Sequence, residues 1–145
     1  MSVTISETHD IATCRHLRRV VFIDEQGVSE ADEIDDLDAI AVHFLAIEHG
    51  QALGSARLIV EGTSGKIGRV CVLAQARGRG IGAALIRTTV AYLQAIPGVT
   101  TARLGAQTHA IAFYEALGFT PLGDIYLDAG IDHQDMILSL RAEDL

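Results

Sequence analysis

The chain has 145 residues, about half of them apolar, and a net charge of −8. This predicts one globular domain spanning residues 1–145, and the negative charge argues against a nucleic-acid partner, which would need a basic face. We expect no membrane partner, because no apolar run approaches the roughly 20 residues that span a bilayer, and residues 1–7 lack the features of a secretion signal. Only two cysteines are present, Cys14 and Cys71, which favours a reducing, cytoplasmic location over a disulfide framework.

The charges are distributed unevenly along the chain. Residues 24–38 hold eight acidic side chains, whereas residues 62–114 hold none. That second stretch is basic and contains Lys66, Arg69, Arg77, Arg79, Arg87 and Arg103. One part of the chain is therefore suited to a cation and the other to an anion, although an acidic block is often only an exposed loop.

The first predicted elements are a strand and a helix. Residues 3–6 alternate as a short strand, and Thr8 or Asp10 can cap a following helix. The helix carries its apolar face at Ile11, Cys14, Leu17 and Val21. It is expected to end near residues 26–27, and the acidic segment follows as a loop or a short helix.

Three consecutive strands are predicted next. Residues 41–48 and 53–61 form a hairpin around a turn at 49–51. Turn-forming residues at 62–65 lead into a third strand at 66–73. Its apolar positions alternate only partly, as expected for a central strand that is buried on both faces.

The C-terminal half alternates helices with strands. One helix begins at Ile81 and stops before Pro97, and a second is capped by Thr108 and closed by Gly118 in a left-handed conformation. Further strands are predicted over residues 101–105, 120–127 and 134–140. The order is strand, helix, loop, three strands, helix, strand, helix and two strands, which predicts an α/β (α+β) fold with strand–helix–strand crossovers.

A glycine-rich loop joins the third predicted strand of this series to the helix that follows. In the segment Arg77-Gly78-Arg79-Gly80-Ile81-Gly82, glycines occupy alternate positions before a helix N-terminus. Unpaired backbone N–H groups and the helix dipole make such a terminus an anion site suited to a pyrophosphate. A Walker A loop would end in Gly-Lys-Ser/Thr, and a Rossmann loop would be followed by an acid at 99–105; neither is present. A merely flexible turn remains the alternative when the loop is taken alone.

Together, the motifs resemble the GNAT superfamily of acyl-CoA N-acyltransferases over nearly the whole chain. The Arg77-x-x-Gly80-x-Gly82 pattern is similar to its acyl-CoA signature, and Gln107-x-x-Ala110-x-x-Phe113-Tyr114-x-x-x-Gly118-Phe119 resembles its second signature. The ElaA-like branch is suggested by Arg19-x-x-Phe22-x-x-Glu25-Gln26, the acidic segment, His43, residues 127–131, His133 and Met136. The chain departs from the pattern at Gln107 and Gly105, where asparagine is common. The resemblance implies a GNAT-type fold with a mixed sheet of about seven strands and about four helices.

The same resemblance implies how acetyl-CoA would bind and react. Backbone groups of Val70 and Val72 would hold the pantetheine arm like an added strand, and the Val72 N–H would polarise the thioester carbonyl. Tyr114 would protonate or stabilise the leaving thiolate, and the amine would attack directly. The implied cofactor-binding residues are Val70, Val72, Arg77, Gly78, Arg79, Gly80, Ile81, Gly82, Gln107 and Tyr114. Strand alternation should turn Cys71 to the opposite face from its neighbours, as a buried structural cysteine.

The acceptor and the general base are less constrained by the sequence. Many GNAT enzymes place a glutamate on the fourth strand, and this chain has none there. Glu25, His43 and His109 are candidates for the acceptor side, and the base is left open among Glu25, Glu30, Asp32, Glu33 and His43. Asp128, Asp132, His133 and Asp135 match no standard ligand spacing, so no metal is expected.

The sequence is compatible with three hypotheses about the function. The leading one is an N-acetyltransferase acting on a small-molecule or protein amine. The alternative is a non-catalytic acyl-CoA-binding or sensing module, motivated by the missing glutamate. An enzyme like the acyl-homoserine-lactone synthases is a third, although the acidic run does not suit an acyl-carrier-protein surface. Pairing of the C-terminal strands across a homodimer is a further hypothesis.

Overall fold

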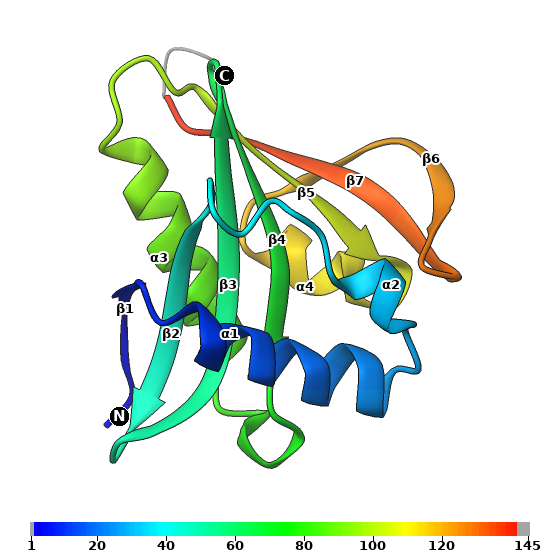
Figure 1. Cartoon of the computed structure of the whole chain (residues 1–145). Helices are drawn as coiled ribbons and strands as arrows, with labels where there is room; N and C mark the ends of the chain where they lie inside the picture. Colours follow the sequence, from blue (N-terminus) through cyan, green and yellow to red (C-terminus); the bar gives the residue numbers. More distant parts are fainter. Residues whose placement is uncertain (1, 142–145) are drawn as a thin grey trace.

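Seven strands form one mixed sheet in the computed structural model, which describes residues 2–141 (Figure 1). The strands are β1 (Thr4–Thr8), β2 (Val42–Glu48), β3 (Gln51–Glu61), β4 (Ser64–Val72), β5 (Thr101–Gln107), β6 (Thr120–Asp128) and β7 (Ile131–Ser139). Their order across the sheet is β1-β2-β3-β4-β5-β7-β6, and among these described strands only β4 and β5 are parallel neighbours. The predicted mixed sheet of about seven strands is confirmed.

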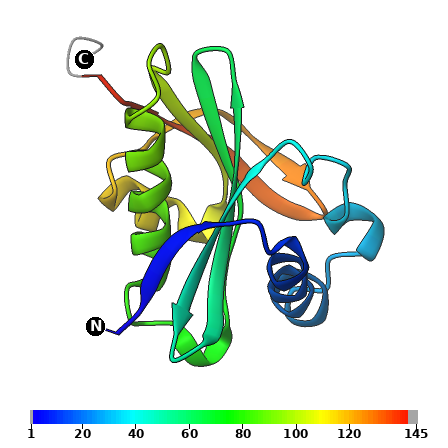
Figure 2. The ribbon, with the colours of Figure 1, turned by 60° about the vertical axis from the view of Figure 1, so that its left-hand side comes forward.

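Helices cover both faces of this sheet. They are α1 (Ile11–Arg18), the π-helix η1 (Arg19–Glu25), α2 (Glu30–Glu33), α3 (Ile81–Gln94) and α4 (Ile111–Ala116), with short 3-10 turns at η2 (Ala74–Ala76) and η3 (Thr108–Ala110). Figure 2 shows α3 and α4 on one face and α1 with its continuation on the other. The chain therefore has the helix–sheet–helix layering that its alternating pattern predicts.

Two hydrophobic cores hold the layers together. The larger core packs α3 and α4 against the sheet around residues such as Leu58, Ile67 and Leu85. The smaller core lies under α1 and includes Leu17 and Cys71. Because Val70 and Val72 pack into the larger core, Cys71 faces the opposite side of β4, as strand alternation predicts.

Two helix termini differ from the sequence-based expectation. The first helix does not stay α-helical to its end, since Arg19–Glu25 widen into a π-helix, a form that often occurs at functional sites. Thr108 does not cap the last helix; it opens η3, and α4 begins at Ile111 with no side-chain cap. Gly118 closes this helical segment with φ of +100°, in agreement with the prediction.

Strands β4 and β5 pair only at their beginnings. Their parallel register runs from Ser64↔Thr101 to Ile67↔Leu104 and ends there, although β4 continues to Val72 and β5 to Gln107. Within the described residues, the edge of β4 from Gly68 to Val72 therefore has no strand partner on the β5 side. This divergence, which Figure 1 shows between the two ribbons, leaves backbone groups available to a ligand.

A β-bulge lies in β4 beside that divergence. Ser55 pairs with Cys71 and Arg57 with Gly68, so β4 contains one residue more than β3 in this interval. Arg69 lies in the bulge and has φ of +50°, a left-handed conformation that a non-glycine residue rarely adopts. Bulges of this kind change the direction of side chains near functional sites.

Candidate functional site

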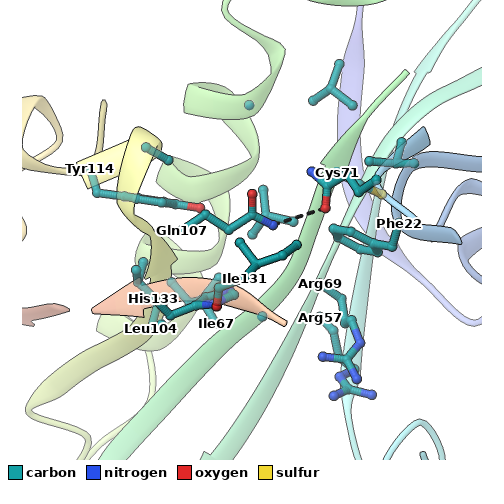
Figure 3. Close-up of a pocket in the computed structure, with 18 of the residues that line it drawn as sticks. Phe22, Arg57, Ile67, Arg69, Cys71, Leu104, Gln107, Tyr114, Ile131 and His133 are labelled. Atoms are coloured by element: carbon teal, nitrogen blue, oxygen red, sulfur yellow. Dashed lines mark hydrogen bonds between the residues drawn. The ribbon is translucent and has the colours of Figure 1, made fainter. Parts of the chain in front are cut away.

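A cavity of about 860 Å³ occupies the space opened by the divergence of β4 and β5. Its wall is built from β4, the glycine loop, β5, α4, η1 and the hairpin of β6 and β7. Figure 3 shows side chains from both sheet faces around it, including Tyr114 and Gln107 on one side and Phe22 on the other. Residues that are far apart in sequence therefore meet in one site.

The glycine loop lines one end of this cavity. Gly78 and Gly80 have φ of +79° and +81°, which a side chain would strain, and Gly80 is the N-cap residue of α3. Among residues 2–141, no side chain caps that helix, so its first-turn N–H groups are available to an anion. A Cβ at Gly82 would meet only ordinary contacts, from Phe113 and Val72. The positive φ angles and the uncapped helix N-terminus are the features on which the predicted pyrophosphate site depends.

The two loop arginines are not free cations. Arg77 Nη1 and Nη2 donate to Glu25 at 2.5 and 2.7 Å, and Arg79 Nη1 and Nη2 donate to Glu48 at 3.0 and 2.6 Å. No acid lies near these arginines in the sequence, and the fold supplies both. Hydrogen bonding from Arg77 lowers the pKa of Glu25, and Arg79 with Ser2 lowers the pKa of Glu48 to about 2.

Glu25 lies in the cavity, but its carboxylate is directed at Arg77. Arg77 also donates from Nε to the carbonyl oxygen of Val72 at 3.0 Å. The guanidinium therefore links η1 to the end of β4, and Glu25 is committed to that link. Val70 and Val72, the residues expected to hold the pantetheine arm, line the same cavity.

Tyr114 of α4 lines the cavity from the larger core. Its ring makes edge-to-face contacts with Phe113 and Phe119, with centroids 5.0 and 6.1 Å away. Burial raises the pKa of Tyr114 to about 12, because the phenolate loses hydration there. The hydroxyl therefore stays protonated at neutral pH.

Gln107 and His109 form a bridge across the site. Gln107 Nε2 donates to Gln26 Oε1 at 3.1 Å, and His109 Nε2 lies 2.7 Å from Gln107 Oε1. An amide oxygen only accepts hydrogen bonds, so His109 carries its proton on Nε2 in this contact. The bridge connects the end of β5 to the end of η1, and both predicted residues lie in the cavity.

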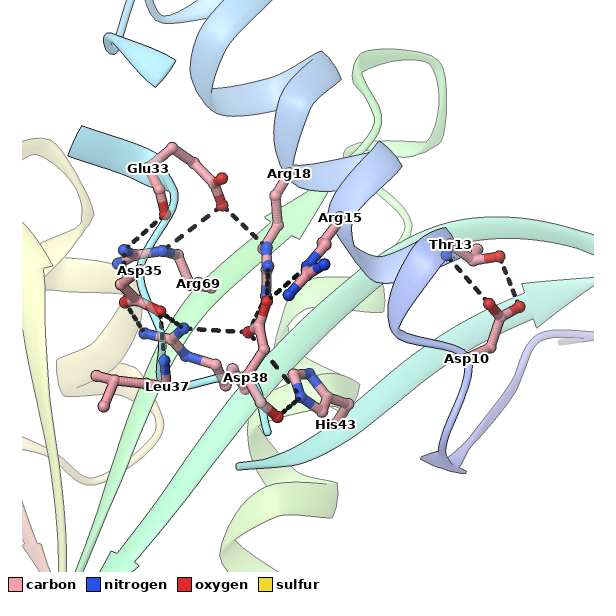
Figure 4. Close-up of polar contacts among 11 residues, drawn as sticks. Asp10, Thr13, Arg15, Arg18, Glu33, Asp35, Leu37, Asp38, His43 and Arg69 are labelled. Atoms are coloured by element: carbon pink, nitrogen blue, oxygen red, sulfur yellow. Dashed lines mark hydrogen bonds and ion pairs between the residues drawn. The ribbon is translucent and has the colours of Figure 1, made fainter. Parts of the chain in front are cut away.

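The structure does not bring His43 to the cavity. Its side chain is only 3% exposed, and Nε2 lies 2.9 Å from the backbone oxygen of Asp38. His43 is not among the residues that line the cavity. The prediction that it lies on the acceptor side is therefore wrong. It belongs instead to the polar core beneath the acidic segment (Figure 4).

The acidic run is largely a paired network rather than a free cation site. Arg18 and Arg57 both contact Asp38, Arg57 also holds Asp35, and Arg69 donates to Asp35 and to the Glu33 backbone. Burial alone would raise the pKa of Asp38, but hydrogen bonds from Arg18, Arg15 and Arg57 outweigh it and lower that pKa. These contacts fix the segment of residues 33–38 against β3 and β4.

The hairpin of β6 and β7 supplies a wall that the sequence did not predict. Tyr126 Oη donates to Asp135 at 2.6 Å, and burial followed by this hydrogen bond raises the pKa of Tyr126 to about 12. Tyr126 also stacks on His133, and both line the cavity. Across residues 2–141, no three His, Cys, Asp or Glu side chains cluster as a metal site. Nor does any helix in that range have the length and apolarity to cross a membrane.

The fold and site define an acyltransferase of the GNAT class, and the comparisons agree. The model of the acetyltransferase (GNAT) domain matches residues 21–140, so the chain belongs to this family. It is an enzyme whose family uses an acyl-CoA and an amine acceptor. The uncharacterized N-acetyltransferase YjcF of Bacillus subtilis is 33% identical over 123 residues, covering 84% of this chain and 87% of its own.

Solved structures show the same similarity over nearly the full chain. An acyl-CoA N-acyltransferase from Pseudomonas aeruginosa is 28% identical, with a TM-score of 0.83 over 94% of this chain and 99% of its own. Escherichia coli ElaA is 26% identical, with a TM-score of 0.84 over the same shares. These matches confirm the predicted GNAT fold and its ElaA-like character.

Proposed function

We propose that this protein is an N-acetyltransferase that moves an acetyl group from acetyl-CoA to a primary amine in a ternary complex. One observation carries the proposal: a single cavity joins the uncapped N-terminus of α3, the unpaired edge of β4 and the Tyr114 hydroxyl. The three features match the diphosphate, the pantetheine amides and the thioester sulfur, in that order along the ligand.

The residues divide the reaction between them. Backbone N–H groups of Gly78 to Gly82 bind the diphosphate, and the Val72 N–H stabilises the oxyanion that forms when the amine attacks the thioester carbonyl. As the carbon–sulfur bond breaks, the thiolate takes a proton from Tyr114, whose raised pKa keeps it protonated at neutral pH. The acyl group passes directly to nitrogen, with no covalent enzyme intermediate.

The acceptor amine enters from the side opposite the loop. That end of the cavity is lined by polar side chains of β3, β4 and the β6–β7 hairpin, including Arg57, Arg69, His133 and Asp128. Phe22 and Ile131 add apolar surface there. An amine attached to a mixed apolar and polar body fits these surroundings.

An assay for thiol release from acetyl-CoA tests the proposal. The acceptors to be supplied are polyamines, amino sugars, amino acids and peptides. We expect release with at least one amine class and a large loss of kcat in Tyr114→Phe, with acetyl-CoA affinity nearly unchanged. The alternative is a non-catalytic acyl-CoA-binding or sensing module, favoured by the lack of a glutamate on β4. Tight acetyl-CoA binding without release from any amine would establish that alternative instead.

A further inference from the structure

Three side chains form a row across the C-terminal strands. Gln107 of β5 is paired with His133 of β7, and His133 is paired with Tyr126 of β6. Residues directly opposite each other in antiparallel strands project from the same face. All three line the cavity, and the His133 and Tyr126 rings stack with centroids 6.0 Å apart and 23° between their planes. The row therefore carries an imidazole into the cavity that contains Tyr114.

The hydrogen bond at His133 defines its tautomer. Nδ1 lies 2.8 Å from the carbonyl oxygen of Ile131. A carbonyl oxygen only accepts, so Nδ1 carries the proton in this contact and Nε2 of the neutral ring keeps its lone pair. No hydrogen bond within residues 2–141 engages that Nε2. His133 thus has an available proton acceptor on the side of the ring turned away from Ile131.

The other basic groups of the cavity are less suited to accept a proton. Glu25 is held by Arg77, and Glu33 lies between Arg18 and Arg69. Hydrogen bonding from Arg77 lowers the pKa of Glu25 and weakens that carboxylate as a base. Asp32 and Asp128 are exposed to solvent. His109 donates from Nε2 to Gln107 and so keeps an acceptor at Nδ1. It is exposed to solvent, however, whereas His133 is half-buried beneath the Tyr126 ring.

Tyr126 holds the imidazole in place. Its hydroxyl is fixed by Asp135, and a Cβ at Gly105 would lie 2.5 Å from that oxygen. The absence of a side chain at Gly105 therefore makes room for the tyrosine that stacks on His133. Tyr126 is a positioning residue, because it acts on the imidazole rather than on the reacting atoms.

We propose that His133 Nε2 is the general base that deprotonates the acceptor ammonium, an inference that rests on the proposed function. The ammonium gives one proton to Nε2, and the freed lone pair attacks the thioester carbonyl carbon. When the carbon–sulfur bond breaks, Tyr114 protonates the thiolate, and the second proton shed by nitrogen restores the phenol through water. His133 then returns its proton to solvent, so one proton is released for each amide formed.

The first test compares His133→Gln with His16→Gln. Glutamine keeps a polar side chain but cannot take up the proton, and His16 is an exposed residue of α1 outside the cavity. The substrate is benzylamine, or the alkylamine with the highest thiol release, and the readout is kcat/KM for the acetylated product. We expect a loss of about 100-fold or more in His133→Gln and wild-type values in His16→Gln, with unchanged thermal melting for both.

A pH profile separates a base from a merely structural histidine. The deficit of His133→Gln should shrink as the pH approaches ~10, where about half of an alkylamine is uncharged without help. The titratable groups around the imidazole are Tyr126 and Asp128 on β6 and Asp132 and Asp135 on β7, with uncharged Gln107 opposite on β5 and His109 next to it. In His133→Ala, added imidazole should restore acetylated product.

The outcomes separate the two proposals. An active wild type with an equally active His133→Gln overturns the role of His133 and leaves the proposed function standing. A deficit that stays constant at every pH and resists imidazole also overturns it. A wild type that binds acetyl-CoA but acetylates no amine overturns the proposed function itself, and the base with it.

Discussion

Gly105 leaves the space that the Tyr126 hydroxyl occupies, since a Cβ at residue 105 would lie 2.5 Å from Tyr126 Oη. The atom that would collide is the far end of a side chain, which can move. Gly105→Ala should therefore displace the ring and break its hydrogen bond to Asp135, at a stability cost of about 1 kcal/mol. Urea unfolding measures the cost, and a crystal structure of the variant shows the ring.

Gly65→Ala is the comparison variant for Gly105→Ala, because it also adds a Cβ too close to a side chain. Its Cβ would lie 2.3 Å from Leu93 Cδ2 inside the larger core, where neighbours cannot move aside easily. Overpacking of this kind costs about 1–3 kcal/mol, so Gly65→Ala should lose more stability than Gly105→Ala. Equal losses in the two variants would contradict this explanation of the Gly105 site.

We expect Gly80 to be important for CoA binding as well as for stability. Its φ of +81° strains any side chain, so Gly80→Ala should lose roughly 1–2 kcal/mol of stability. Gly98 has φ of +85°, equally open surroundings and no place in the cavity. Gly98→Ala should therefore show a similar loss of stability, while only Gly80→Ala weakens CoA binding in calorimetry. Matching CoA affinities in the two variants would argue against the loop as the diphosphate site.

Glu48 holds the Arg79 guanidinium, and we expect it to compete with a bound phosphate for that group. The pair is near the surface, where an ion pair contributes little to stability. Glu48→Gln should free the guanidinium and tighten CoA binding by about two- to five-fold at low salt, with a smaller gain at high salt. Glu30→Gln is the control, because it removes the exposed partner of Arg19 outside the cavity. A gain of the same size in Glu30→Gln would show that net charge alone is responsible.

Tyr114 should make the protein sensitive to alkaline pH. The unfolded chain releases the phenolic proton near pH ~10, whereas burial in the folded state raises the pKa to about 12. Between these values the unfolded state binds fewer protons, so the free energy of unfolding falls as the pH rises. The loss is on the order of 3 kcal/mol for Tyr114. Urea unfolding at several pH values gives the free energy of unfolding as a function of pH. Between pH ~10 and ~12 this free energy should fall less steeply with pH in Tyr114→Phe than in the wild type. An identical pH dependence in the two proteins would contradict burial of the hydroxyl.

The fold could be predicted because its signals are local. Hydrophobic periodicity located the strands to within a few residues, and the glycine loop before Ile81 stood between a strand and a helix as the motif requires. Gly118, at the end of the last helical segment, adopts the left-handed conformation expected from its position. Each of these features depends on residues that are close neighbours in sequence.

The charge pairing could not be predicted, because it depends on contacts between distant segments. Arg77 is 52 residues away from Glu25, and Arg57 is 22 residues away from Asp35. A block of acids gives no sign of which arginines will neutralise it. His43 looked like a site residue for the same reason, since nothing local reveals that its ring is turned to the Asp38 backbone.

The β6–β7 wall was missed because its residues, although some of them suggested the ElaA-like branch, gave no sign in the sequence that they would line a cavity. Tyr126, His133 and Gly105 come together only through the register of β5, β7 and β6. A glycine at residue 105 was visible as a departure from the family pattern. Its physical reason, the nearby tyrosine hydroxyl, required the structure.

The central claim is that the backbone at the start of α3 binds the diphosphate of coenzyme A, and a crystal structure of the complex tests it most directly. We expect the phosphate oxygens within hydrogen-bond distance of the N–H groups of Gly78 to Gly82, with the pantetheine arm between β4 and β5. Density for coenzyme A at another surface, with the loop amides facing only water, would contradict the assignment.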